Sequence, residues 1–458
     1  MGLRNLFHKP LHFEYALLAH SLCKLLRLYA LCRQLCLVKK ELAGEKKVVT
    51  TLAKKDDENY KKTLALLKPY LTSAAYQKTL EYSRDKLRLE MTFELVHLAL
   101  SVPFCFNNTL LKFWHLSGEL LRHKCHYSQV LVYFALRLGF SFLFRLPFRY
   151  YTAYRLEKKH GFKTKSRFVF LKQYLLCYAF YVLLLTGLAS GLTWLNKFSK
   201  SNFRVNALAF LVFFKTALVF VVPLFLAFEH KLLPLSDPEL RREVDAMGKK
   251  LGLTSKNVHV VSANTAPSHG LALHWGFCKF KHAYLNESYV TLGKPSAMAL
   301  LSHVFGHFKH HHFFKTFVFD LLKDSLFLFL FDHFKGDTAL FKSFNTHSVP
   351  ALTMKLDTFV AFVCPLYFLC NALKSVYFHY LEFEADRHAV RLGHSDELVN
   401  FWTTVYREKK WFFNVDPLYG KLFNFNPLFG AKHGGAPSLF ERVYAVYDAT
   451  VASKPVSN

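Results

Sequence analysis

The chain has 458 residues, of which 52% are hydrophobic and 17% aromatic, including 49 Phe. This composition is too apolar for most soluble proteins and indicates an integral membrane protein. The formal net charge of +28 could attract nucleic acid, but the Lys and Arg residues lie between apolar runs and no nucleic-acid-binding motif is present. We therefore expect membrane lipids, and no nucleic acid, as partners of the basic segments.

Seven stretches are long and apolar enough to span, or nearly span, a bilayer. They cover residues 12–38, 90–116, 127–148, 168–196, 206–229, 313–333 and 356–380. The fourth and fifth are the clearest, whereas Lys24, Arg27 and Arg33 interrupt the first. The sequence therefore predicts an all-α integral membrane protein with seven transmembrane helices.

Charge predicts how these helices are oriented. The loops 39–89 and 149–167 are rich in Lys and Arg, and the alternate loops carry fewer. Because basic loops stay in the cytosol, we expect both of these loops there, together with the polar regions 230–312 and 381–458.

Ionisable residues also occur within or near the predicted spans. They are Arg137, Arg145, Lys172, Lys215, Asp320, Lys323 and Asp324. Each would cost roughly 3 kcal/mol if it faced lipid at mid-membrane. Snorkelling explains those near the span ends, and the others suggest that the helices enclose a wet interior.

The segment "LLSHVFGHFKHHH", residues 300–312, contains histidines at helical spacing. His303 and His307 are four residues apart, so on a helix both imidazoles can reach one metal ion. In HExxH zinc peptidases the intervening Glu is the general base, but here Val304 takes that position. With 24 His in the chain, a buried helix that merely contains histidines is the alternative. We interpret the run 310–312 as a polar helix end at the membrane surface.

A second segment, "YLEFEADRHAVRLGH" at residues 380–394, places Glu382 and Asp386 on one helix face. Glu382 would complete a His–His–Glu site with His303 and His307. Asp386 would accept a hydrogen bond from a ligand imidazole and so fix its tautomer. Taken alone, the pair would be read as an ordinary solvated helix face.

These segments resemble the type I CAAX prenyl proteases, membrane zinc metallopeptidases that remove the C-terminal tripeptide of prenylated proteins. "LSHVFGHFK" (301–309) is similar to the family's HELGHWK helix, and "EFEADRHAVRLG" (382–393) to its EFQADAFA helix. "LPFRYYTAYRLEKKHGF" (146–162) follows the family's PFxYYxTFxIExKHGF loop, and "APSLFER" (436–442) follows its HPPLLER segment. The order and spacing of the four segments also match.

The resemblance implies seven helices that form a barrel around a water-filled chamber, with a mostly helical cytosolic zinc-metallopeptidase domain. It implies one zinc ion at His303, His307 and Glu382, with Asp386 behind the ligands. It also implies residence in the endoplasmic reticulum and nuclear envelope, with the zinc domain toward the cytosol, and prenylated CAAX proteins as clients.

The expected organisation has four parts. Residues 1–229 would hold membrane helices one to five, and residues 230–312 a cytosolic metallopeptidase segment with the degenerate HExxH helix. Residues 313–380 would hold membrane helices six and seven. Residues 381–458 would supply the third-ligand helix and a C-terminal cytosolic segment.

Three positions depart from the family pattern. Val304 replaces the general-base Glu, whose loss typically costs about 10²–10⁴ in rate. Ala436 stands where the family has the His that stabilises the oxyanion, and loss of one such donor costs on the order of 10²–10³. Leu271 stands where a family Asn holds the substrate backbone, and Arg442 is assigned to the same substrate groove.

The sequence therefore predicts a catalytically impaired homologue that retains zinc for structure and binds prenylated or membrane-inserting, translocating polypeptides. An active zinc endopeptidase with an unorthodox base is the first alternative, and a non-proteolytic transporter or lipid-binding bundle is the second. If no metal is bound, His303 and Glu382 would form a buried ion pair.

Overall fold

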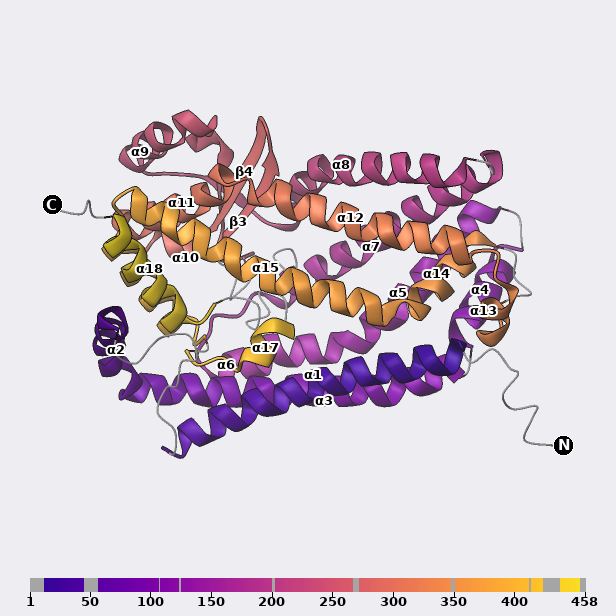
Figure 1. The fold of residues 1–458 in the computed structure, drawn as a ribbon, viewed down its shortest axis with the longest axis horizontal. Coiled ribbons are helices and arrows are strands. Elements are labelled where there is room, and N and C mark those ends of the chain that lie inside the picture. The colour runs from indigo at the N-terminus through magenta and orange to yellow at the C-terminus, as the bar shows by residue number, and fades with distance from the viewer. Residues whose placement is uncertain are drawn as a thin grey trace.

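The computed structural model describes residues 12–44, 57–106, 108–122, 125–199, 202–266, 272–346, 351–411, 413–422 and 437–453. Long helices run lengthwise through the molecule; α9, α11, α18 and the strands lie at one end, and the short helices α4 and α13 lie at the other (Figure 1). The long helices are α1 (His12–Leu42), α3 (Ala74–Phe106), α5 (His126–Tyr151), α7 (Arg167–Phe198), α8 (Phe203–Glu229), α12 (His312–Phe334) and α15 (Cys364–Arg391).

Each predicted span is helical, but two of them are broken. The second passes from α3 into α4 (Thr109–Leu120) at Asn108, whose φ of 50° ends a regular helix. The seventh is divided into α14 (Leu352–Phe362) and α15, which meet at 62°. Within the described residues, α1, α5, α7 and α8 are long and apolar enough to cross a membrane, and the α14–α15 pair makes a fifth candidate. The count of seven spans stays a prediction.

The remaining helical elements connect the long helices or pack at the end that carries the strands. They are α2 (Glu58–Leu71), the π-helix η2 (Thr152–Leu156), α6 (Glu157–Lys159), α9 (Pro238–Gly248), η3 (Lys249–Leu251), η4 (Ser255–Asn257), α10 (Glu287–Val290), α11 (Lys294–Lys309), α13 (Thr338–Ser343), α16 (Ser395–Glu408), α17 (Pro417–Leu422) and α18 (Leu439–Ser453).

A four-stranded sheet corrects the prediction of an all-α fold. Its strands are β1 (Leu232–Pro234), β2 (Val258–Val261), β3 (Ala272–Phe277) and β4 (Phe280–Asn286), in the order β1-β2-β4-β3. β2 pairs with β4 in parallel, while β3 and β4 form an antiparallel hairpin. The strands are only three to seven residues long, which is too short for a clear alternation signal.

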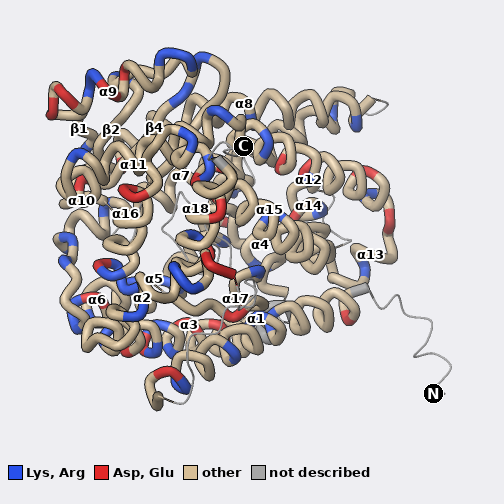
Figure 2. Tube along the Cα trace, turned by 60° about the vertical axis from the view of Figure 1, so that its left-hand side comes forward, with Lys and Arg blue, Asp and Glu red and all other residues tan. Residues whose placement is uncertain are grey.

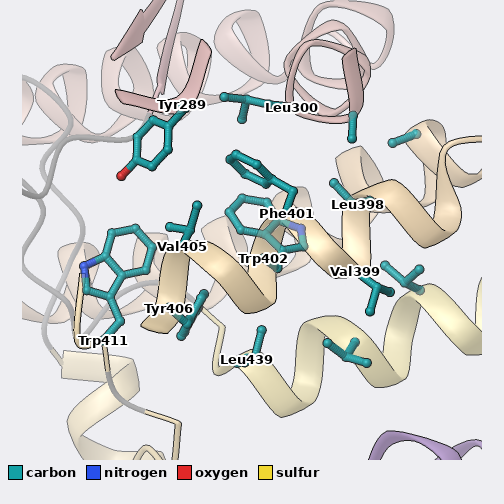
Figure 3. Close-up of a cluster of buried hydrophobic side chains, with 14 of the residues drawn as sticks. Tyr289, Leu300, Leu398, Val399, Phe401, Trp402, Val405, Tyr406, Trp411 and Leu439 are labelled. Carbon is teal, nitrogen blue, oxygen red and sulfur yellow. The ribbon is translucent and has the colours of Figure 1, made fainter. Parts of the chain in front are cut away.

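The main hydrophobic core holds this end of the molecule together. On α16, Leu398, Phe401, Trp402 and Val405 occupy positions i, i+3, i+4 and i+7 of one helix face and are fully buried. Figure 3 shows these side chains between α11 and α18, with Tyr289 and Leu300 above them and Leu439 below. α16 therefore fixes the position of α18 relative to α11.

Ion pairs account for most of the charges noted inside the predicted spans. Three of the four pairs join two different helices and the fourth lies within α12, so neither charge of a pair has to face lipid alone. The pairs are Arg137–Asp357 at 2.7 Å, Lys215–Asp324 at 2.6 Å, Lys374–Asp320 at 2.5 Å and Lys323–Asp320 at 3.4 Å. These residues therefore do not by themselves require a wet interior, and the water-filled chamber stays a prediction.

Candidate metal centre

Helix α11 carries the two histidines through the middle of the core. It starts after Gly293, with Pro295 in its first turn, where a missing backbone N–H costs nothing. Every residue from Ala297 to Phe308 is buried, because neighbouring elements cover the helix on all sides. His303 and His307 are each 3% exposed.

A glycine lets α15 approach α11 closely enough to bring Glu382 to the histidines. A Cβ at Gly306 would lie 3.0 Å from the backbone Cα and O of Ala385 and 3.0 Å from His388 Cβ. Such distances are shorter than ordinary van der Waals contact, so only glycine fits here without displacing α15. The helix crossing therefore depends on a residue inside the histidine motif.

The structure brings His303, His307 and Glu382 together. One ligand atom from each lies within 4.8 Å of the others, an arrangement able to hold a metal ion. The Nε2 atoms of the two histidines are 3.1 Å apart. Glu382 Oε2 lies 3.6 Å from His303 Nε2, and Glu382 Oε1 lies 3.7 Å from His307 Nε2.

Asp386, which the sequence predicts to lie behind the ligands, contacts His303 on the side away from Glu382. Its Oδ1 lies 2.8 Å from His303 Nδ1, and Trp402 Nε1 donates to the same oxygen at 3.3 Å. Arg442 Nε lies 3.2 Å from Asp386 Oδ2, and its guanidinium also donates to Glu382. Burial opposes ionisation of Asp386, but Arg442 and His303 outweigh it and hold the pKa of this carboxyl below its ordinary value.

His307 has a different support on its far side. His307 Nδ1 lies 2.8 Å from His312 Nδ1, and His312 Nε2 lies 2.9 Å from Glu384 Oε2. Glu384 also approaches His310 Nδ1 at 3.2 Å. On the other face of His307, the ring of His274 on β3 stacks at a centroid distance of 4.0 Å.

The hydrogen-bond directions can be assigned from these contacts. His312 meets neighbouring cations and Glu384, but burial dominates and lowers its pKa to about 4, so its imidazole is neutral near pH 7. Glu384 can only accept, because its pKa lies below the ordinary value. His312 therefore donates from Nε2 to Glu384 and accepts at Nδ1 from His307. His307 is left with no hydrogen on Nε2.

On His303, Nδ1 lies 2.8 Å from Asp386 Oδ1, so this carboxylate can accept a hydrogen from Nδ1. In the tautomer with its hydrogen on Nδ1, His303 presents the lone pair of Nε2 to His307 Nε2 at 3.1 Å, beside the Glu382 carboxylate. A cation between the two nitrogens would then accept a lone pair from each of them. Two neutral imidazoles and one carboxylate are a donor set that zinc prefers, so these residues fit the ion that the motif implies.

The position between the histidines holds no base. Val304 is 2% exposed and belongs to the main hydrophobic core. A valine accepts no proton, so this helix turn cannot activate a water molecule as a Glu would. The two other departures, Leu271 and Ala436, lie outside the described residues.

Comparisons with known proteins agree with this arrangement. The model for the CAAX prenyl protease N-terminal region, with five membrane helices, matches residues 58–227, and the model for peptidase family M48 matches residues 234–447. The chain belongs to the CAAX prenyl protease family. It is a membrane metallopeptidase homologue of that family.

Individual relatives cover nearly the whole chain. The CAAX prenyl protease 1 homolog of Arabidopsis thaliana is 25% identical over 386 residues, covering 82% of this chain and 88% of that protein. The Homo sapiens homolog is 25% identical over 457 residues, covering 87% and 92%. The crystal structure of S. mikatae Ste24p has the same fold, with a TM-score of 0.76, 22% identity, and coverage of 95% of this chain and 98% of that one.

One residue of this CAAX prenyl protease homologue was assigned to the substrate groove, and one interpretation needs correction. Arg442, the groove residue, is 2% exposed and contacts Glu382, Asp386 and the Trp402 ring, and its place in the groove stays a prediction. The run 310–312 was interpreted as a surface helix end, but His312 is 1% exposed and faces His307. Both side chains support the ligand set.

Sequence reasoning also missed residues that surround the centre. His274 and Trp402 come from β3 and α16, and no local spacing connects either of them with the histidine motif. Glu384, two residues after Glu382, does not join the ligand cluster. Its link to His307 through His312 depends on the turn between α11 and α12, where His311 has a φ of 56°.

Proposed function

We propose that this chain is a zinc-binding but catalytically impaired CAAX prenyl protease homologue that acts by binding prenylated or membrane-inserting polypeptides. The observation that carries the proposal is Val304, an apolar core residue at the position of the general base. The three ligands His303, His307 and Glu382 are all present beside it. What the site lacks is the general-base Glu that would take a proton from water.

No other carboxylate in the described part of the centre is free to replace it. Glu382 faces both histidines and accepts from Arg442. Asp386 lies behind His303, where Trp402 donates to its Oδ1 and Arg442 lies 3.2 Å from its Oδ2. Glu384 lies behind His307 and contacts His310 and His312. Each acid therefore holds a ligand in place and has a partner that keeps it there.

Zinc at this centre would be held by His303 Nε2, His307 Nε2 and Glu382. When bound, zinc supplies a Lewis acid that polarises a carbonyl group. The chain's own residues orient the ligands: Asp386 and His312 fix the two imidazole tautomers, and Arg442 positions the carboxylate. These residues hold the ligands in place without supplying a base, so we propose that the ion is retained for structure.

Binding of an apolar client requires space between the helices. In the most apolar windows of α1, α5, α7 and α8, only 17–22% of residues are buried. Such low burial is expected for helices that face lipid, and we propose that these helices also enclose the chamber that the family resemblance implies. The relatives are named CAAX prenyl proteases, so a prenylated C-terminal segment is the client that we propose.

Charge supports the proposed orientation. Lys and Arg gather on the end of the molecule that carries α2, α6 and α9 (Figure 2). That is also the end that carries α11, so the positive-inside tendency puts the candidate metal centre in the cytosol. We propose the endoplasmic reticulum and nuclear envelope as the membrane.

Two measurements on the purified full-length chain test the proposal. Metal analysis should find about one zinc per chain, as expected for a His–His–Glu site, and the zinc should be absent from His303→Ala. A farnesylated CAAX peptide should bind without being cleaved. Zinc-dependent cleavage by the wild type, abolished in His303→Ala, would instead establish the active endopeptidase, which the intact ligand set makes the second candidate.

A further inference from the structure

Helix α1 carries two cysteines that take no part in the metal centre. Cys32 and Cys36 are both exposed, and they lie one helical turn apart on the same face. The opposite face of α1 is buried through Leu31, Leu35 and Val38. The two thiols therefore point away from the rest of the protein.

The face that carries the two cysteines is apolar over the preceding turns. Leu18, Leu22, Leu25 and Tyr29 are 58%, 56%, 50% and 55% exposed. They lead to the cysteines at alternating spacings of four and three residues, which keeps a straight stripe on one side of a helix. Because α1 is long and apolar enough to cross a membrane, an exposed apolar stripe on it would face lipid.

Polar contacts near Cys32 and Cys36 indicate where α1 passes from the hydrocarbon layer of the membrane to the headgroup region. Arg33 Nε donates to Asp416 Oδ2 at 2.9 Å, next to Cys32 in the sequence. One turn beyond Cys36, Lys39 and Lys40 are exposed. The cysteines therefore lie between an apolar lipid-facing surface and a basic helix end, at the depth of the lipid headgroups.

We propose that Cys32 and Cys36 are S-acylation sites that take a long-chain acyl group from an acyl-CoA thioester. The thiol sulfur attacks the thioester carbonyl carbon, and a new carbon–sulfur bond to cysteine forms as the bond to the coenzyme A sulfur breaks. The cysteine proton ends on the coenzyme A thiol, so the exchange needs no oxidant or reductant. The acyl chain then lies in lipid along Leu25, Leu22 and Leu18.

Cysteines at a juxtamembrane helix end are the usual acceptors of such chains, and burial of the acyl methylenes in lipid adds membrane affinity. Acylation here would fix the depth of the end of α1. That end binds the 414–416 segment through Arg33 and Gln34. The modification would thus anchor a contact between the membrane helices and the region that leads to α18.

Two other exposed cysteines serve as matched controls. Cys125 precedes α5 at the opposite end of the long helices, and Cys278 lies in the turn between β3 and β4. Neither continues an exposed apolar helical stripe into a basic helix end. The structure therefore predicts acylation at Cys32 and Cys36 and none at these two positions.

Acyl exchange on the full-length chain expressed in eukaryotic cells tests the proposal. After free thiols are blocked, hydroxylamine cleaves thioesters and a polyethylene-glycol maleimide adds a mass tag to each released thiol. The wild type should show two tags, Cys32→Ser and Cys36→Ser one each, and the double variant none. Cys125→Ser and Cys278→Ser should each retain both tags.

The proposal is overturned if the wild type shows no hydroxylamine-dependent tag or if the double variant keeps the wild-type pattern. Because the substituted side chains are exposed, the variants should fold normally. Their zinc content and their elution in size-exclusion chromatography should equal those of the wild type, so a lost tag reports a lost acceptor rather than a misfolded chain.

Discussion

With Val304 in place of the general base, the site keeps its zinc ligands but lacks the residue that would activate water for hydrolysis. The ligands and their supporting groups surround it, yet its own side chain contributes only to the hydrophobic core. We therefore predict that Val304→Glu combined with Ala436→His confers zinc-dependent cleavage of a farnesylated CAAX peptide. The restored base should contribute about 10²–10⁴ in rate over the single Ala436→His variant.

Product release followed by mass spectrometry would measure this gain. His303→Ala in the same background should abolish it, because the base acts only beside the ion. If the double variant binds zinc and the peptide but cleaves nothing, the groove has diverged beyond the two restored positions, and Leu271 would be the next residue to replace.

Glu384 gives a second prediction for a single residue. It accepts from His312, which in turn orients His307. Glu384→Ala should weaken zinc binding by about 10–100-fold, the range seen when outer partners of metal ligands are removed. Competition with a chromophoric chelator would measure the affinity. Glu119→Ala, an exposed carboxylate on α4, should have no effect, and equal loss in both variants would contradict a specific role for Glu384.

Among the structural elements, the crossing of α11 and α15 decides whether Glu382 reaches the histidines. Gly306→Ala would place a Cβ 3.0 Å from the backbone of Ala385. The two helices must then move apart, which should cost about 1–3 kcal/mol of stability, as for other overpacked cores. We expect a lower Tm and a lower zinc content for this variant than for the wild type.

Gly336→Ala provides the matched control, because nothing lies within 4 Å of the added Cβ. Thermal unfolding in detergent, with metal analysis of the same samples, would compare the two variants. If Gly306→Ala keeps the wild-type zinc content and Tm, the crossing adapts easily and the glycine is not what positions Glu382.

The elements also show what the sequence could and could not predict. Long apolar runs specify helices by length alone, so all the predicted spans are helical. The spacing of His303 and His307 places them on one helix face, and the position of Asp386 follows from the same geometry. Helical spacing cannot show that Arg442 folds back onto Glu382 or that His274 stacks on His307, because those contacts depend on tertiary packing. The sheet escaped notice because its strands are short.

For the whole molecule, buried neutral histidines predict sensitivity to acid. The pKa of His274 is lowered to about 3 and that of His388 to about 4, in both cases mainly by burial. His312 is lowered to about 4 by burial, against the opposing effect of Glu384. In the unfolded chain each imidazole would titrate near its ordinary value of about 6.5.

Below pH 6.5 the unfolded chain therefore binds protons that the folded protein does not. The free energy of unfolding should be constant above about pH 6.5 and should fall by up to roughly 1 kcal/mol per pH unit for each such histidine as the pH drops toward 4. Tm values from intrinsic fluorescence at pH 7.5, 6.5 and 5.5 would check this.

His303→Ala, which we expect to lack zinc, should show the same trend, since burial rather than metal loss causes it. A Tm that stays constant or rises between pH 6.5 and 5.5 would show that these imidazoles gain protons in the folded state, against the packing described here.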